Sequence, residues 1–168
     1  KQVLKALIAA LLHLKKESIH DVAITNPIEL GAAISDKDFI LDIRVNLNNE
    51  QLIDLEMQMS NEYNWSERSI SYAARSFDQL NSGEEYKEVL PVHSIGFLNF
   101  TLFEDQPEFF ATYELRNKKT GHLYSSKFSI HVLDLTRIDL ATAEDQNYEI
   151  DRWAKLFKAK TWEELRMI

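Results

Sequence analysis

The chain has 168 residues, of which 45% are apolar and 27% charged, an ordinary globular mixture. A formal net charge of −8 argues against a polycationic nucleic-acid coat, and the lack of cysteine excludes disulfide scaffolds and zinc–cysteine sites. With only 4 glycines, long flexible linkers and Gly-rich phosphate loops are not expected. The length predicts a single domain, residues 1–168, that is large enough to bury its own core.

The charge is spread unevenly along the chain. Residues 1–20 hold four lysines against one glutamate, and residues 150–168 hold five basic residues against three acidic ones. The excess of acid therefore lies in the middle of the sequence. There it either covers a solvated surface or supplies carboxylates that bind a metal.

The first predicted element is an amphipathic helix at residues 3–12, where apolar side chains recur at helical spacing. This segment is too short to span a bilayer and has no signal-cleavage pattern. We therefore expect a cytoplasmic protein with no membrane partner. A short β-tolerant run at residues 21–26, stopped by Pro27, predicts the first strand.

A β-hairpin is predicted next, because residues 39–45 and 52–59 both alternate and residues 46–50 between them favour a turn. A helix follows, with capping residues at 60–64 and an end near Gly83. Residues 92–100 read as a buried strand, and residues 109–115 and 123–135 flank a second hairpin turn. Helices close the chain at residues 150–157 and after Thr161. This order predicts an α/β (α+β) fold, a mixed sheet covered by helices with an antiparallel β extension.

Three polar side chains of the first hairpin form a candidate metal site. Asp42 interrupts an apolar run, and Glu56 and Gln58 share one face of the neighbouring strand, roughly 7 Å apart. A hairpin partner can bring Asp42 beside them. Two carboxylates and an amide oxygen suit Mg²⁺ or Mn²⁺, which can polarise a phosphate. Asp54 shares this face, and we interpret it as a bystander.

Other interpretations compete with this site. Alternating polar residues on a strand often mark only the solvent face of a half-exposed sheet. No spacing typical of zinc ligands connects the histidines, which we expect to be structural: His13, His20, His93, His122 and His131. The sequence has no Gly-x-Ser-x-Gly elbow, and it has no Walker-type loop, so no nucleotide cofactor is expected.

Four blocks in order, at residues 39–45, 55–61, 67–75 and 83–95, resemble the Rpn group of recombination-promoting nucleases. This group is also described as PD-(D/E)XK nuclease family transposases. The resemblance extends over about residues 20–165 and is strongest from 39 to 103. It implies a restriction-endonuclease-like core of the αβββαβ kind and metal-dependent cleavage of DNA in recombination or mobile-element biology.

The resemblance also implies roles for individual residues. Asp42 and Glu56 match the two acids of the family motif and would bind Mg²⁺ or Mn²⁺, and Gln58 stands where the wider superfamily usually has lysine. Arg68, Tyr72 and Arg75 match the helix pattern and share one helix face. They would contact DNA phosphates or orient the site, or else form an ordinary ion-paired helix face.

Two departures from the family pattern affect the predicted activity. The family usually has a Phe- and Lys-containing segment before the first helix, which this sequence lacks. An acid from the first helix also has no clear counterpart, Glu17 and Glu29 being the candidates. The competing hypothesis is a nuclease fold with a decayed site that binds DNA or protein. A homodimer would suit two cuts in a duplex.

Overall fold

The computed structural model describes residues 1–25 and 42–168. Its first half contains α1 (Gln2–Leu11), β1 (Val22–Ile24), β2 (Asp42–Leu47), β3 (Gln51–Gln58), α2 (Trp65–Phe77) and β4 (Val92–Leu98). The second half contains β5 (Phe110–Glu114), β6 (Phe128–Asp134), α3 (Ala143–Asn147), α4 (Ile150–Lys158) and α5 (Trp162–Arg166). Short 3-10 turns lie at Lys16–Ser18 (η1), Tyr86–Glu88 (η2) and Ile138–Leu140 (η3). The first six helices and strands follow the predicted αβββαβ order.

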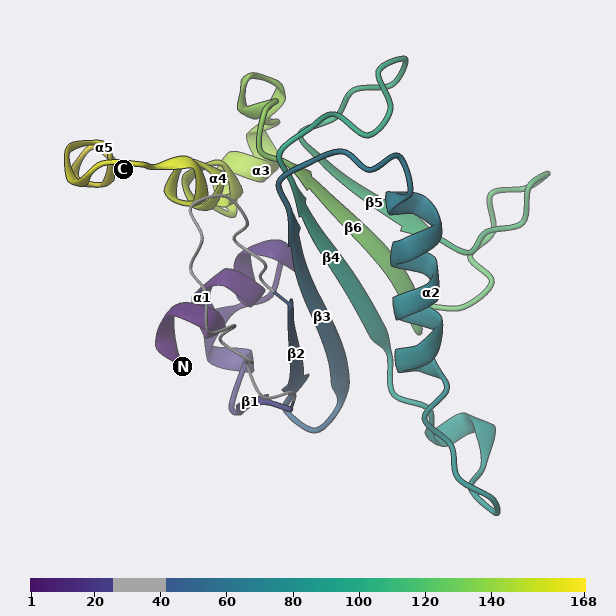
Figure 1. Cartoon of the computed structure of the whole chain (residues 1–168). Coiled ribbons are helices and arrows are strands. Elements are labelled where there is room, and N and C mark those ends of the chain that lie inside the picture. Colours follow the sequence, from purple (N-terminus) through teal and green to yellow (C-terminus); the bar gives the residue numbers. More distant parts are fainter. Residues whose placement is uncertain (26–41) are drawn as a thin grey trace.

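The strands form a six-stranded sheet in the order β1-β2-β3-β4-β6-β5 (Figure 1). Strands β1, β2 and β3 are antiparallel neighbours, whereas β3, β4 and β6 run parallel to one another. Strand β5 pairs with β6 in antiparallel fashion at the edge. The second hairpin predicted from the sequence therefore extends the main sheet through β6. The mixed sheet flanked by helices is that of a restriction-endonuclease-like fold, as predicted.

The turn between β2 and β3 fixes the register of the first hairpin. Asn48 and Asn49 have φ angles of 55° and 58°, in the left-handed region that asparagine tolerates better than most residues. The Asn48 side-chain amide accepts bonds from the backbone of His20 and Asp21 and donates one to Ser18. The turn is thereby tied to the segment that leads into β1.

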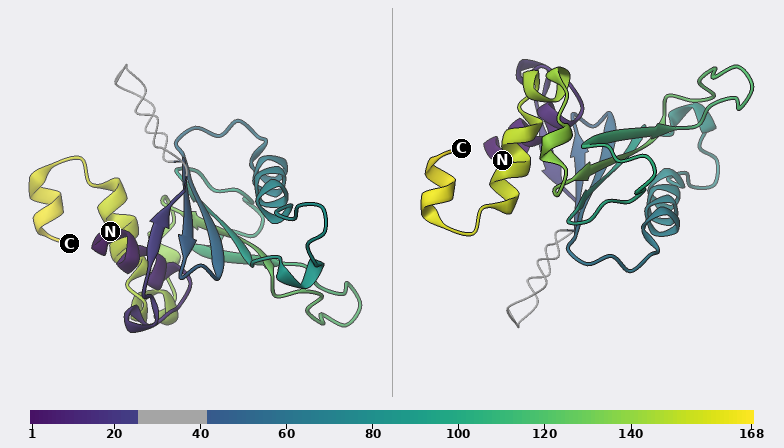
Figure 2. Two further views of the ribbon diagram at one scale, coloured as in Figure 1. Left: turned by 90° about the horizontal axis from the view of Figure 1, so that it is seen from below. Right: turned by 90° about the horizontal axis from the view of Figure 1, so that it is seen from above.

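Helices cover both faces of the sheet (Figures 1 and 2). The face toward α1 and α4 carries the main core, in which Ile8, Ile53, Phe97 and Ile150 are all fully buried. The opposite face is covered by α2, which is amphipathic as its sequence predicts. No helix in the described ranges is long and apolar enough to cross a membrane.

Close packing places the start of α2 against the middle of β4. A Cβ atom added at Gly96 would lie 2.1 Å from the ring of Trp65, so only glycine fits there. Asn64, within the predicted capping segment 60–64, is the N-cap residue of α2, but its side chain makes no capping hydrogen bond. At α5 the Thr161 hydroxyl does accept a bond from the backbone of Glu164, as the sequence predicts.

Candidate functional site

The hairpin places Asp42 directly opposite Glu56. The register of β2 and β3 pairs these two residues, and directly opposite residues of an antiparallel pair point to the same face with Cβ atoms about 5 Å apart. Glu56 contacts α2, so both carboxylates lie on the α2 face of the sheet. Their charges interact closely enough that Asp42 contributes to the raised pKa of Glu56.

Glu56 is held by an arginine of α2. The Nε atom of Arg68 donates to Oε1 of Glu56 at 2.7 Å, and 16% of the Glu56 side chain is exposed. Burial raises the pKa of Glu56 above its ordinary value; Asp42 and Asp54 add to the increase, and Arg68 opposes it. A cation placed beside Glu56 and Asp42 would relieve this accumulation of negative charge.

Gln58 lies two residues after Glu56, so its side chain points to the same face. Its Oε1 atom is buried and accepts no hydrogen bond. An unsatisfied buried acceptor costs about 1–3 kcal/mol, which makes this oxygen available to a cation or a bound water. The amide oxygen and the two carboxylates thus form an oxygen-rich group at the end of β3.

Asp54 shares this face but has different partners. Arg44 Nε donates to Oδ1 of Asp54 at 2.8 Å, and the Ser76 hydroxyl donates to Oδ2. Arg44 also donates to the Ser76 hydroxyl at 2.6 Å. These contacts join both strands of the hairpin to the last turn of α2, which agrees with the interpretation of Asp54 as a bystander.

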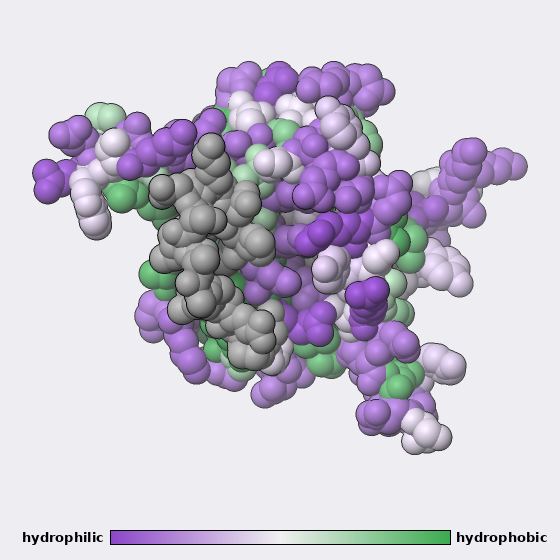
Figure 3. Space-filling model, viewed as in Figure 1, coloured by the Kyte–Doolittle hydropathy of each residue, from purple (hydrophilic) through white to green (hydrophobic). Residues whose placement is uncertain are grey.

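The three residues of α2 singled out in the sequence form one stack. The guanidinium carbons of Arg68 and Arg75 lie 5.3 Å and 5.9 Å from the centre of the Tyr72 ring, within cation–π range. Arg68 reaches Glu56 from this stack, whereas Arg75 is exposed. The exposed side of α2 belongs to a largely hydrophilic surface (Figure 3).

Protein atoms supply only part of the ligand set that a hard divalent cation needs. In the described ranges, no three His, Cys, Asp or Glu side chains are grouped to hold a metal. Mg²⁺, however, usually takes only one or two carboxylates and keeps several waters. Asp42 and Glu56 can supply the two carboxylates, and the unsatisfied Gln58 oxygen can supply a further ligand or accept a hydrogen bond from a bound water. Of the two further acids considered, Glu17 lies in the exposed η1 turn, and Glu29 falls outside the described residues.

A second polar cluster, which the sequence did not single out, lies on the opposite face of the sheet. His93, Ser129 and His131 are joined there by hydrogen bonds beside a cavity. The one available signal was the spacing of Ser129 and His131, two residues apart on one face of a buried strand. The bonds to both rings agree with the expected structural role of these histidines.

Comparisons with known proteins agree with the fold. A family model described as PD-(D/E)XK nuclease family transposase matches residues 1–168, the whole chain. A search of curated proteins and a search of solved structures each found no match.

Proposed function

Because the chain belongs to the PD-(D/E)XK nuclease family of transposases, we propose that it is a DNA endonuclease that depends on Mg²⁺ or Mn²⁺ and acts in recombination or on mobile elements. The observation that carries the proposal is the direct pairing of Asp42 with Glu56 across the hairpin. We also propose a cytoplasmic location and a homodimer, since a two-fold pair of sites suits two cuts in a duplex.

Asp42 and Glu56 would hold the cation, and the cation would supply a positive charge to polarise the scissile phosphate. Arg68 fixes the Glu56 carboxylate through its bond to Oε1. The Gln58 amide oxygen can accept a hydrogen bond from the attacking water and orient it. A neutral amide cannot remove the proton of that water, so the contribution of Gln58 is positional.

DNA would approach the site along the Arg68–Tyr72–Arg75 stack. Arg75 is exposed and can pair with a phosphate, whereas Arg68 is already ion-paired with Glu56. The overall charge of −8 opposes DNA binding elsewhere on much of the surface. Binding that depends on a few such contacts falls as salt rises, in proportion to the number of phosphates neutralised.

A second candidate is a module of the same fold that binds DNA or protein without cleaving it. Two observations favour it. Gln58 is neutral where the wider superfamily usually has lysine, and Arg68 already compensates the charge of Glu56. Such a module would keep its DNA contacts but gain no activity from a divalent cation.

Cleavage of supercoiled plasmid in Mg²⁺ or Mn²⁺ tests the proposal. We expect nicking by the wild type and a loss on the order of 100-fold or more in Asp42→Ala. Glu67→Gln removes an exposed carboxylate of α2 next to Arg68 and serves as the matched control, with activity unchanged. Equal cutting by wild type and Asp42→Ala would refute the assigned site. DNA binding without cutting by the wild type would establish the non-catalytic module instead.

A further inference from the structure

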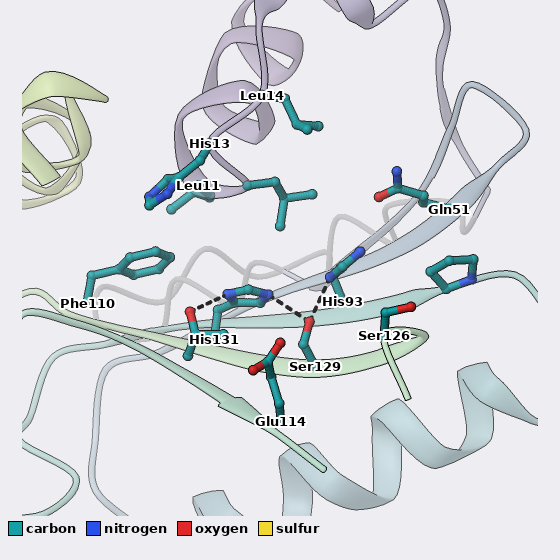
Figure 4. Close-up of a pocket in the computed structure, with 13 residues that line it drawn as sticks. Leu11, His13, Leu14, Gln51, His93, Phe110, Glu114, Ser126, Ser129 and His131 are labelled. Carbon is teal, nitrogen blue, oxygen red and sulfur yellow. Dashed lines mark hydrogen bonds between the residues drawn. The ribbon is translucent and has the colours of Figure 1, made fainter. Parts of the chain in front are cut away.

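A cavity of about 350 Å³ lies on the sheet face opposite the candidate nuclease site (Figure 4). It is bounded by the C-terminal end of α1 and the residues after it on one side, and by the start of β3 with β4, β5 and β6 on the other. Its volume is within the range of small-molecule sites in proteins, about 300–1,000 Å³. Its walls are mixed: Phe110 and the leucines at and just after the end of α1 are apolar, whereas the strands contribute polar side chains.

The strand side of the cavity carries a continuous chain of hydrogen bonds. His93 Nδ1 lies 2.7 Å from Ser129 Oγ, which lies 2.9 Å from His131 Nε2. His131 Nδ1 in turn lies 3.0 Å from Thr112 Oγ1. Both ring nitrogens of His131 are therefore engaged. The remaining nitrogen of His93, Nε2, takes no part in the chain and lies on the Gln51 side of the ring (Figure 4).

The cavity offers no compensation to a charged ligand. Burial lowers the pKa of His93, and burial together with the charges of His93 and His13 lowers the pKa of His131 to about 3, so both rings are neutral at pH 7. Among the described residues that line the cavity there is no Lys or Arg, His13 Nδ1 lies 3.7 Å from the Glu144 carboxylate, and Glu114 is ion-paired with Arg116. An unpaired ligand charge would be costly here, so the ligand is neutral.

The same charges exclude a hydrolytic role for Ser129. A serine activated by histidine requires the ring to become an imidazolium, which a buried carboxylate normally stabilises. His131 is instead oriented by the neutral Thr112 hydroxyl. The chain therefore orients the free nitrogen of His93 for binding, and that nitrogen donates or accepts according to the direction of the chain.

We propose that this cavity binds a neutral adenine nucleoside. The Gln51 amide presents a donor and an acceptor together, the pattern that matches the N6 and N7 edge of adenine. Guanine is recognised best by Arg or Lys, and a phosphate is bound best by the same side chains. The described lining residues include no Arg and no Lys. His93 Nε2 supplies a further hydrogen bond, and Leu11, Leu14 and Phe110 cover the apolar ring faces.

Titration of the whole chain with adenosine, followed calorimetrically, tests this proposal. We expect a dissociation constant on the order of 10⁻⁴ M, which is the affinity that ordinary ligand efficiency gives for a molecule of this size. His93→Phe and Gln51→Leu should each weaken binding by about 10-fold, because each removes a hydrogen bond. AMP and guanosine should bind at least about 10-fold more weakly than adenosine. Thermal melting of each variant shows whether it is folded.

Asp42→Ala provides the matched control, since it changes the opposite face of the sheet and should leave adenosine binding unchanged. The proposal is independent of nuclease activity and survives the loss of that activity. It is overturned if adenosine does not bind at millimolar concentration, if AMP binds as tightly as adenosine, or if folded His93→Phe and Gln51→Leu both bind like the wild type.

Discussion

Three acidic residues of the first hairpin look alike in the sequence but have different surroundings in the fold. Asp54 and Glu56 both alternate with apolar residues on β3, yet Asp54 meets Arg44 and Ser76, whereas Glu56 meets Arg68 and faces Asp42. The period of two predicted the shared face correctly. It could not predict the partners, because these come from a helix whose position depends on the packing of Trp65 on Gly96.

The pH dependence of cleavage should report the contact between Arg68 and Glu56. Glu56 must be ionised to bind a cation, and its pKa is raised, so activity should fall as pH falls through a value above the ordinary glutamate range. Arg68 opposes this increase. In Arg68→Gln the acidic limb of the pH–rate profile should therefore move to higher pH.

Two variants control this experiment. Arg68→Lys keeps the positive charge, so its acidic limb should lie between those of the wild type and Arg68→Gln. Arg75 contacts Tyr72 on the same helix, and Arg75→Gln should leave the limb at its wild-type position. An Arg68→Gln profile that coincides with the wild-type profile would show that the ion pair does not govern the protonation of Glu56.

A substitution at Gln58 should lower activity without lowering stability. Its Oε1 atom is buried without a hydrogen bond, so Gln58→Leu removes an unsatisfied acceptor and should leave the free energy of unfolding unchanged or raise it by about 1 kcal/mol. Cleavage should fall at least about 10-fold, because the water loses its orienting group. Urea unfolding and plasmid cleavage measure the two effects. A variant that is less stable but fully active would assign Gln58 to packing alone.

At the scale of secondary structure, the sequence predicted the elements that depend on local pattern. The first hairpin, α2, β4 and the terminal helices lie close to their expected ranges within the described residues, and residues 39–41 of the predicted hairpin lie outside them. The sequence did not predict α3, whose five residues carry no apolar stripe, or the parallel pairing of β4 with β6. That pairing joins strands separated by about 30 residues of chain, and alternation within a strand does not identify its neighbour.

The packing of α2 on β4 should make the fold sensitive to any side chain at position 96. A Cβ atom at position 96 would overlap the Trp65 ring, so Gly96→Ala should lower the free energy of unfolding by about 1–3 kcal/mol. Because Glu56 is the register partner of Gly96, cleavage should also fall. Urea unfolding checks the stability change, and Ser94→Ala on the same face of β4 should have a smaller effect.

A double mutant identifies the cause of this loss. If the overlap is responsible, Trp65→Leu combined with Gly96→Ala should be less destabilised than the sum of the two single changes, by about 0.5–3 kcal/mol. Additive effects would mean that the strand, and not the contact with the helix, is what requires glycine.

At the scale of the whole molecule, the sheet separates two regions of different chemistry. The α2 face carries Asp42, Glu56 and Gln58, and the α1 face carries the main core and the cavity with its neutral histidines. Composition and motif order predicted the fold class and the family. They could not predict the cavity, because its lining comes from the end of α1, four strands and the loops that precede β4 and β6.

The buried histidines should make the fold sensitive to acid. Unfolded histidine has a pKa near 6.5, whereas the pKa of His131 is lowered to about 3 and that of His93 is also lowered. Unfolding therefore takes up protons, so stability is complete above pH 6.5 and falls as pH decreases below it. Between pH 6 and 5 the free energy of unfolding should fall by about 1.4 kcal/mol per pH unit for His131, and His93 should add to this fall.

Urea unfolding at several pH values measures this slope. His131→Gln should reduce the slope by about 1.4 kcal/mol per pH unit, the contribution of that histidine. His122→Gln, which changes an exposed residue, should keep the wild-type slope. A His131→Gln slope equal to that of the wild type would contradict the assignment of the acid sensitivity to this cluster.

If Asp42 and Glu56 bind one divalent cation together, titration with Mn²⁺ followed by electron paramagnetic resonance will detect the shared site. The wild type should bind Mn²⁺ with an affinity that Asp42→Asn and Glu56→Gln each lower by about 10-fold or more, while Glu67→Gln leaves it unchanged. If Asp42→Asn or Glu56→Gln bound Mn²⁺ as tightly as the wild type, the two carboxylates would not share an ion.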